Sequence, residues 1–384
     1  MKKMQYKNPR IKPIYPLYRI DSNTFRIGAQ VGITKEFNDP THQLWELAKL
    51  LNGQDIEKVF NKERKKFPDV QMSDQYILDG IDLLNKEGFI EELLPQTECS
   101  INKRYVPNIK YFSHFIDASG DRFKPQKIIN QSKILLLGLG GGGSNILTLL
   151  AGLGPQKITI IDYDVVEEEN LGRQFLYRED DIGKNKTEVA KKAIQAINSN
   201  IEIEAHNMKI TTAHDIEAYV KEVDIVICAI DEPQFLITRI VNEAIVKGNK
   251  PCVFAGSQVT HGRVFTIIPG VTGCFDCLNI HYSITDPGFL NQFRALAKSG
   301  FQARSIAYGP AIFQLTSTIV DEVVRVLTSY LSPVTLSTQF EVDYTNSTSF
   351  KHPAWPRYKE RCPTCGNGKE DEWEVFKYYP LFNR

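Results

Sequence analysis

The chain has 384 residues, and 42% of them are apolar, enough to bury a sizeable core in more than one domain. Its 46 basic and 46 acidic residues balance, which excludes the globally basic surface that nucleic acids and anionic membranes attract. No apolar run approaches the roughly 20 residues that span a bilayer, and no apolar signal core follows the lysine-rich start. We expect a cytoplasmic protein without a nucleic-acid or membrane partner.

Residues 1–100 predict a small α+β module. Alternating runs at 18–20 and 24–27, and a third run near 31–33, predict short strands. Helical patterns follow over 42–51, from residue 56, and over 73–87, where Ser73 is the expected N-cap and Gly88 the terminator. Three strands and three helices predict a winged-helix-like module. Its third helix is acidic where a DNA-recognition helix is basic, so nucleic acid is a poor partner.

After a segment at 101–130, expected to be a linker and dimer contact, residues 131–384 predict a Rossmann-like α/β domain with a mostly parallel sheet. An apolar run at 134–137 leads into a glycine-rich stretch and a helical pattern, and a second apolar run ends before Asp162. The candidate phosphate-binding glycines are Gly138, Gly140, Gly141 and Gly143. They allow a sharp turn that brings phosphates to a helix N-terminus. A nicotinamide-dependent oxidoreductase has the same loop, with Asp162 meeting a ribose hydroxyl.

The polar block that follows favours different chemistry. Arg173 and Lys186 place two fixed cations within one βαβ unit. Hydride transfer does not need such a pair, whereas a triphosphate that loses pyrophosphate does. A solvated charged face explains Lys184 well but Arg173 poorly, because apolar residues flank Arg173 on both sides.

Asp231 follows another apolar run, at 224–230. An aspartate just past a strand C-terminus is well placed to bind Mg²⁺, because ligands of open α/β sheets bind at that edge. The alternative is that Asp231 caps a helix that begins near Gln234.

The cysteines predict a structural zinc site. Their number is odd, seven, which argues against a disulfide framework. Four of them form two Cys-x-x-Cys pairs beside turn-forming residues, at Cys274, Cys277, Cys362 and Cys365. Two such knuckles that converge give a closed tetrahedral thiolate set suited to Zn²⁺. Four independently buried thiols are the alternative, and Cys228 and Cys252 are expected in the core.

Together these motifs resemble the ThiF, MoeB and HesA family, bacterial relatives of ubiquitin-activating enzymes that adenylate a carboxyl-terminal group with ATP and Mg²⁺. The resemblance covers about 131–365. It implies a two-fold homodimer, a long spacing between the zinc-binding pairs, and catalytic roles for Arg173, Lys186 and Asp231. The nucleotide-binding set that it implies is Asp162 at the ribose, with Asp164, Asn170 and Gln174 beside it.

One segment departs from the family pattern. The family has an Arg-Tyr-x-Arg segment whose second arginine reaches the partner subunit's ATP site. Here the segment ends in Pro107. Either Arg104 or Lys110 supplies that charge, or the contribution in trans is missing and turnover suffers.

The C-terminal half raises two further questions. Residues 279–310 contain no cysteine, so transfer of the activated group to a thiol is not expected. The segment also contains three basic residues that are candidates for holding a substrate terminus, Arg294, Lys298 and Arg304. The alternative is that they belong to a mobile, solvated loop. The apolar stripe of a helix over 313–327 forms either a subunit interface or intramolecular core.

The first 100 residues resemble the leader-recognition modules of ribosomally made peptide pathways, in which a precursor peptide adds as a strand. A domain that serves packing alone is the alternative. With this module, the chain resembles the peptide nucleotidyltransferases of the microcin C type. The resemblance implies that ATP, or another nucleoside triphosphate, modifies the terminal carboxyl or amide of a precursor peptide. The other hypotheses are an idle leader-binding partner of a cyclodehydratase and an activator of a ubiquitin-like sulfur carrier.

Overall fold

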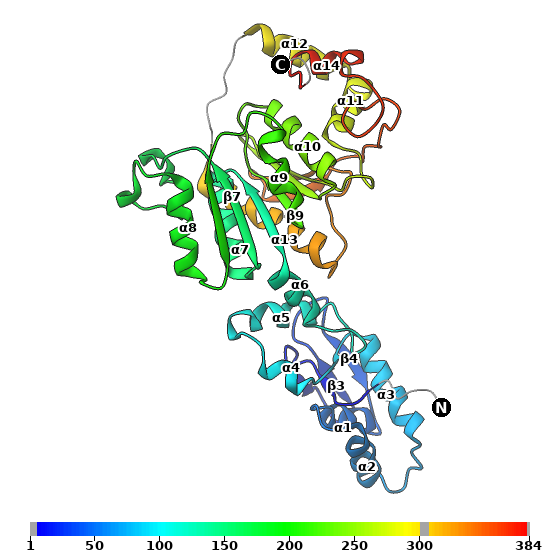
Figure 1. The fold of residues 1–384 in the computed structure, drawn as a ribbon. Coiled ribbons are helices and arrows are strands. Elements are labelled where there is room, and N and C mark those ends of the chain that lie inside the picture. Colours follow the sequence, from blue (N-terminus) through cyan, green and yellow to red (C-terminus); the bar gives the residue numbers. More distant parts are fainter. Residues whose placement is uncertain (1–5, 300–306, 382–384) are drawn as a thin grey trace. The chain divides into compact units, whose positions relative to one another are not determined.

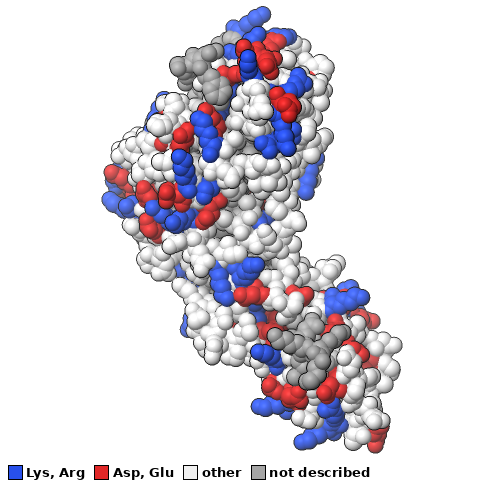
Figure 2. Space-filling view, turned by 45° about the vertical axis from the view of Figure 1, so that its right-hand side comes forward, with Lys and Arg blue, Asp and Glu red and all other residues white. Residues whose placement is uncertain are grey.

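The computed structural model describes residues 6–299 and 307–381. The chain folds into two compact units, residues 1–127 and 128–384, and the segment at 101–127 therefore belongs to the first unit. On the face drawn in Figure 2, basic and acidic side chains are interspersed. Among the described residues, no helix is long and apolar enough to cross a membrane.

The first unit combines two small antiparallel sheets with short helices (Figure 1). Its strands are β1 (Pro9–Ile11), β2 (Leu17–Arg19), β3 (Thr24–Ile27), β4 (Lys35–Asn38) and β5 (Ile90–Glu92), in sheets of order β1-β5 and β2-β3-β4. Its helices are α1 (Gln43–Leu50), α2 (Ile56–Lys66), α3 (Asp74–Lys86), α4 (Pro95–Cys99), α5 (Val106–Ser113) and α6 (Lys124–Gln131), the last of which crosses the unit boundary.

The three expected helices of this unit are confirmed, and one strand prediction is wrong. Ser73 caps α3 by accepting the N–H of Tyr76, and Gly88 ends it with φ 82°. The run at 31–33 is a turn rather than a strand, and the side chain of Val31 is 99% exposed. The strand lies at Lys35–Asn38 instead, where charged residues hide the alternating pattern.

The second unit is built on one eight-stranded sheet of order β13-β12-β11-β10-β9-β6-β7-β8. Five strands are parallel: β6 (Lys133–Leu137), β7 (Lys157–Asp162), β8 (Glu202–Asn207), β9 (Ile225–Cys228) and β10 (Cys252–Ser257). Three are antiparallel: β11 (His261–Ile267), β12 (Phe340–Asp343) and β13 (Thr348–Lys351). This confirms the predicted fold class. The chain leaves β6 toward β7 and returns to β9 on its other side, so a topological switch point lies at the end of β6.

Helices cover both faces of this sheet (Figure 1). One core joins the sheet to α7 (Gly141–Leu153), α8 (Lys186–Ile197) and α13 (Gly309–Thr328). The other joins it to α9 (His214–Lys221), α10 (Leu236–Gly248), α11 (Phe275–Thr285), α12 (Pro287–Ser299) and α14 (Glu374–Lys377). Leu315, Ile319 and Val323 of α13 are buried in the first of these cores. The apolar stripe of this helix is therefore intramolecular core.

Glu63 on α2 generates a prediction about stability. Its side chain is buried, and its Oε2 has no hydrogen-bond partner among the described residues. Burial, with Glu46 and Asp39 nearby, raises its pKa from 4.5 to about 7. Between these two pH values, the Glu63 carboxyl is ionised in the unfolded chain and protonated in the folded chain. The free energy of unfolding should therefore fall as pH rises through this window and level off above it.

Glu63→Gln should remove this loss and raise the free energy of unfolding at pH 8 by about 1–3 kcal/mol. Thermal or urea unfolding at pH 5 and pH 8 measures the effect. Asp69→Asn, at an exposed position just beyond the same helix, is the control and should change neither value. An equal effect of Glu63→Gln at both pH values would contradict the assignment.

Candidate nucleotide and metal sites

The glycine turn after β6 forms the centre of the site. Gly138 has φ 91°, and a Cβ on it would lie 2.6 Å from the carbonyl oxygen of Ala229. A Cβ on Gly143 would lie 1.8 Å from the carbonyl oxygen of Gly138, so only glycine lets α7 approach the strand this closely. Gly140 is the N-cap of α7, and among the described residues no side chain caps this end. Backbone N–H groups of the first turn are thus left for a phosphate.

Asp162, at the end of β7, ties this turn to the neighbouring strand. Its Oδ2 accepts the N–H of Leu139 at 2.6 Å, and its Oδ1 accepts the N–H of Asp164 at 2.7 Å. Burial raises the pKa of this carboxyl, although the two N–H donors act in the opposite direction. A carboxylate has about four lone-pair sites, so Asp162 keeps acceptor capacity for a ribose hydroxyl.

Lys186 is the first residue of α8 and its side chain is buried. Its Nζ lies 2.9 Å from Oδ2 of Asp164, and its backbone N–H donates to the carbonyl oxygen of Asp164 at 3.0 Å. Asp164 therefore serves as the counterion of Lys186, a role that the sequence did not reveal. This fixes the Lys186 ammonium group beside Asp162. The positive charge of Lys186 lowers the pKa of Asp162 and so partly offsets the effect of burial.

Arg173 crosses the first turn of α7. The Cδ of its side chain lies 3.5 Å from where a Cβ of Gly141 would be, and its Nη1 donates to the carbonyl oxygen of Glu169 at 2.8 Å. Asn145 holds the two segments together, because its Nδ2 donates to the carbonyl oxygens of Gly141 at 2.9 Å and of Arg173 at 3.1 Å. Sequence analysis missed Asn145. The signal in the sequence was an amide residue in the first turns of a mostly apolar helix, four residues after Gly141.

Two buried amides complete this side of the site. Asn170 ends a 3-10 turn, Glu168–Asn170, where its Oδ1 accepts the N–H of Glu167 at 3.1 Å. Gln174 is 2% exposed, and its Oε1 has no partner among residues 6–299 and 307–381. An unpaired buried amide oxygen is costly, so Oε1 of Gln174, the residue after Arg173, is able to accept a hydrogen bond from a bound ligand.

Asp231 lies on the connection from β9 to α10, at the strand next to β6. The packing of Gly138 against Ala229 brings the end of β9 beside the glycine turn. The N-cap of α10 is Phe235, and this end has no side-chain cap hydrogen bond. The alternative in which Asp231 caps that helix is therefore wrong, and its carboxylate is exposed at the edge of the sheet.

The four predicted zinc ligands come together. Their Sγ atoms all lie within 4.8 Å of one another, and the four cysteines are free rather than disulfide-bonded. The Sγ separations are 3.5 Å for Cys274 and Cys362, 3.4 Å for Cys277 and Cys365, and 3.9 Å for Cys274 and Cys277. A tetrahedron with Zn–S bonds of about 2.3 Å places sulfurs about 3.8 Å apart, so this set fits zinc with no open position.

The other candidate residues are placed as follows. Cys228 and Cys252 are buried, as predicted. Arg294 forms a two-armed ion pair with Glu374, at 2.5 and 2.6 Å, so it is engaged within the unit. Arg304 lies outside the described residues. Pro107 lies in the first turn of α5 in the first unit.

A mostly parallel sheet with a glycine turn at its switch point defines a nucleotide-binding α/β domain. The model of the ThiF family matches residues 105–364, and the chain belongs to this family. The predicted nucleotidyltransferase class is thus confirmed at the level of the family. The sulfur carrier protein ThiS adenylyltransferase of Bacillus subtilis is 29% identical over 63% of this chain and 67% of its own length. SUMO-activating enzyme subunit 2 of Dictyostelium discoideum is 33% identical over 43% of this chain, which spans only 24% of that enzyme.

Solved structures of MccB from E. coli share the fold of nearly the whole chain. One covers 94% of this chain and 97% of MccB, with a TM-score of 0.75 and 23% sequence identity. MccB bound to ATP, and MccB bound to AMPCPP and MccA, each give a TM-score of 0.74 at 22% identity and cover 94% of this chain and 100% of the other. At this identity the likeness concerns the fold.

The cysteine geometry predicts about one zinc ion per chain by elemental analysis. Cys362→Ser should leave zinc substoichiometric and lower the melting temperature by about 5–10 °C, because metal binding contributes directly to folding. Cys99→Ser, at an exposed cysteine outside the cluster, is the control and should change neither value. Full zinc content in Cys362→Ser would exclude a four-thiolate site.

Proposed function

We propose that this chain transfers a nucleotidyl group from ATP, or another nucleoside triphosphate, to the C-terminal carboxyl or amide of a ribosomally made precursor peptide. A carboxylate oxygen, or an amide nitrogen that gives up one proton to water, bonds to the α-phosphorus. The bond from that phosphorus to the oxygen bridging it to the β-phosphate breaks, and pyrophosphate leaves. The observation that carries the proposal is the buried Lys186, held by Asp164 next to the Asp162-anchored glycine turn.

The site supplies each element that a triphosphate requires. Backbone N–H groups at the start of α7 donate hydrogen bonds to phosphate oxygens. Arg173 and Lys186 neutralise the negative charge that develops on the departing pyrophosphate. Lys186 acts from a buried position, where water screens its charge little. Asp162 accepts from the ribose, while the amide NH₂ groups of Asn170 and Gln174 donate to phosphate oxygens.

Two metal ions enter the proposal with different roles. Asp231 offers an exposed carboxylate at the ligand-binding edge of the sheet, the ligand type that Mg²⁺ prefers. Mg²⁺ bound by Asp231 would neutralise charge on the leaving pyrophosphate. Zn²⁺ at the four cysteines is structural, because all four positions of the tetrahedron are filled by protein.

The first unit supports a peptide partner. Strand β4 pairs with β3 on one side, and among the described residues no strand pairs with its other side. Lys35 at the start of β4 forms an ion pair at 3.0 Å with Glu87, the C-cap of α3, and α3 also exposes Tyr76 and Leu83. In this proposal an extended peptide adds as a strand to the free edge of β4, near α3. There, backbone hydrogen bonds give affinity and side chains on alternate residues give selection.

The proposal includes a homodimer. Phe175 and Phe313 stack with ring centroids 5.6 Å apart and yet are 62% and 39% exposed. Their surface lies beside Gly309, which approaches the carbonyl oxygen of Gly172 next to Arg173. An exposed aromatic pair next to the nucleotide site is suited to contact with a second subunit.

Two alternatives each have one observation in their favour. Pro107 in place of a family arginine favours a catalytically idle leader-binding partner of a cyclodehydratase. The match to a ThiS adenylyltransferase favours activation of a sulfur carrier, whereas the absence of cysteine from residues 279–310 opposes it. A measurement of pyrophosphate release with and without a precursor peptide separates these two alternatives from the main proposal. Only the main proposal expects release that depends on the precursor peptide.

Lys186→Ala should lower the rate of peptide-dependent pyrophosphate release about 100-fold or more, because it removes the buried positive charge. Lys184→Ala is the matched control. Lys184 also forms an ion pair with an aspartate, Asp181 at 3.0 Å, but in an exposed position. We expect its rate to stay within about twofold of the wild type. Normal pyrophosphate release by Lys186→Ala would refute the site assignment.

The β4 edge generates a second prediction. The N–H of Asp39 donates to Asn23, and the antiparallel alternation from that bond turns the N–H of Glu36 away from β3. Glu36→Pro should weaken peptide binding about tenfold by deleting one donor to the added strand. Glu36→Ala is the control, because it loses the same ion pair with Arg26 and keeps the N–H. Fluorescence anisotropy with a labelled peptide measures both, and equal affinities would place the peptide elsewhere.

A further inference from the structure

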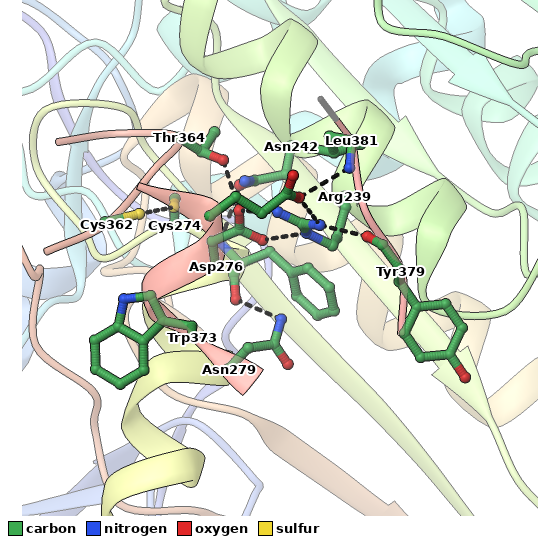
Figure 3. A network of polar contacts seen from close by, with 12 residues as sticks. Arg239, Asn242, Cys274, Asp276, Asn279, Cys362, Thr364, Trp373, Tyr379 and Leu381 are labelled. Atoms are coloured by element: carbon green, nitrogen blue, oxygen red, sulfur yellow. Dashed lines mark hydrogen bonds and ion pairs between the residues drawn. The ribbon is translucent and has the colours of Figure 1, made fainter. Parts of the chain in front are cut away.

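The two residues between the first pair of cysteines contact the helix that follows Asp231. Asp276 accepts two hydrogen bonds from Arg239, from Nε to Oδ1 and from Nη2 to Oδ2, both at 2.9 Å. The neighbouring Phe275 donates its N–H to Oδ1 of Asn242 at 2.9 Å, and its ring lies 5.6 Å from that of Phe235. Figure 3 shows Arg239 and Asn242 of α10 beside Asp276.

These contacts lie on one face at the start of α10. Phe235, Arg239 and Asn242 are separated by four and then three residues, which is the spacing of one helical face. Phe235 is the N-cap of the helix, and Asp231 lies four residues before it. The cysteine knuckle therefore holds the end of α10 that receives the chain from Asp231.

The second pair of cysteines joins the same network. Thr364, between Cys362 and Cys365, donates its hydroxyl to Oδ2 of Asp276 at 2.6 Å (Figure 3). Arg239 is fully buried, and its Nη1 also bonds to Oε1 of Glu370 at 2.6 Å. Both halves of the four-cysteine cluster thus meet on the Asp276–Arg239 pair.

The backbone at Phe235 shows that packing, rather than local preference, places this connection. Its φ is 68° and its ψ is −51°, a positive-φ conformation that residues with a Cβ rarely adopt. Three aromatic rings surround it, at centroid distances of 5.6 Å for Phe275, 4.5 Å for Phe293 and 5.2 Å for Tyr379. Phe275 lies between Cys274 and Cys277, so loss of the cysteine knuckle disturbs one of the three ring contacts that hold this conformation.

We propose that the four-cysteine centre positions the Asp231 connection, residues 229–235, with Phe235 and Arg239 as positioning residues that act through α10. The functional part of this inference rests on the proposed role of Asp231 in binding Mg²⁺. Loss of the metal from the cysteines frees the start of α10 and weakens Mg²⁺ binding at a site to which the cysteines contribute no ligand.

Phe235→Leu is the first test, because it keeps most of the buried volume while removing the ring contacts. We expect the Mg²⁺ concentration for half-maximal pyrophosphate release to rise about tenfold, with zinc content unchanged and a smaller change in the limiting rate. Arg239→Lys keeps the charge without the two-armed geometry and should act in the same direction. The control is Lys247→Gln, which removes ion pairs to Glu217 and Glu243 at the other end of α10 and should leave the Mg²⁺ requirement unchanged.

Hydrogen exchange gives a readout that does not depend on activity. In Phe235→Leu, and in wild-type protein after chelation of zinc, amides at 229–240 should exchange faster, with less change at 244–248. Unchanged exchange at 229–240 in both samples would overturn the inference, as would an unaltered Mg²⁺ requirement in an active Phe235→Leu. A wild-type protein that releases no pyrophosphate refutes the proposed function instead, and exchange alone then decides the coupling.

Discussion

The candidate nucleotide site depends on the two hydrogen bonds that the buried carboxylate of Asp162 accepts. This carboxylate accepts the N–H of Leu139 from the glycine turn and the N–H of Asp164 from its own strand end, so it fixes two loops with one group. Asp164 then holds Lys186 at the start of α8. A chain of three short contacts thus sets the positions of a helix N-terminus and a buried ammonium, the two groups that we propose bind the triphosphate.

Stability alone does not explain this arrangement. The desolvation penalty of a buried ion pair often exceeds its Coulombic gain, and apolar residues of similar volume usually serve a core better. Lys186 and Asp164 are also unequal partners, because the lysine side chain is 5% exposed and the aspartate 46%. A cation withdrawn from water beside a more exposed anion can exchange part of that pairing for a phosphate. Arg173, half-buried over the first turn of α7, adds a second charge in a better-hydrated place.

Local patterns predicted the fold class, the glycine turn and the four cysteines, because each leaves a short signal in the sequence. The strand at 35–38 was missed, since its charged residues face solvent on an edge and show no alternation. The Asp164–Lys186 pair and the bridging Asn145 were also missed, because the sequence around a polar residue does not show which distant residue it contacts. The same limit hid Arg239 and Asp276, which lie 37 residues apart on two helices and meet only in the folded chain.

The two parts of the proposed catalytic site are held by different physical means. Backbone packing fixes the glycine turn. Gly143 lies so close to the carbonyl oxygen of Gly138 that there is no room for a side chain, and this close packing keeps α7 in place. Asp231 lies on a connection that ends at Phe235, a residue with positive φ, and this end depends on side chains from three distant segments. The proposed nucleotide-binding half is therefore intrinsic to the sheet, whereas the proposed Mg²⁺-binding half depends on how α11, α12 and residues 370–379 pack onto α10 and Phe235. Binding of the nucleotide and its activation can consequently be lost separately, although both sites lie at the ends of adjacent strands.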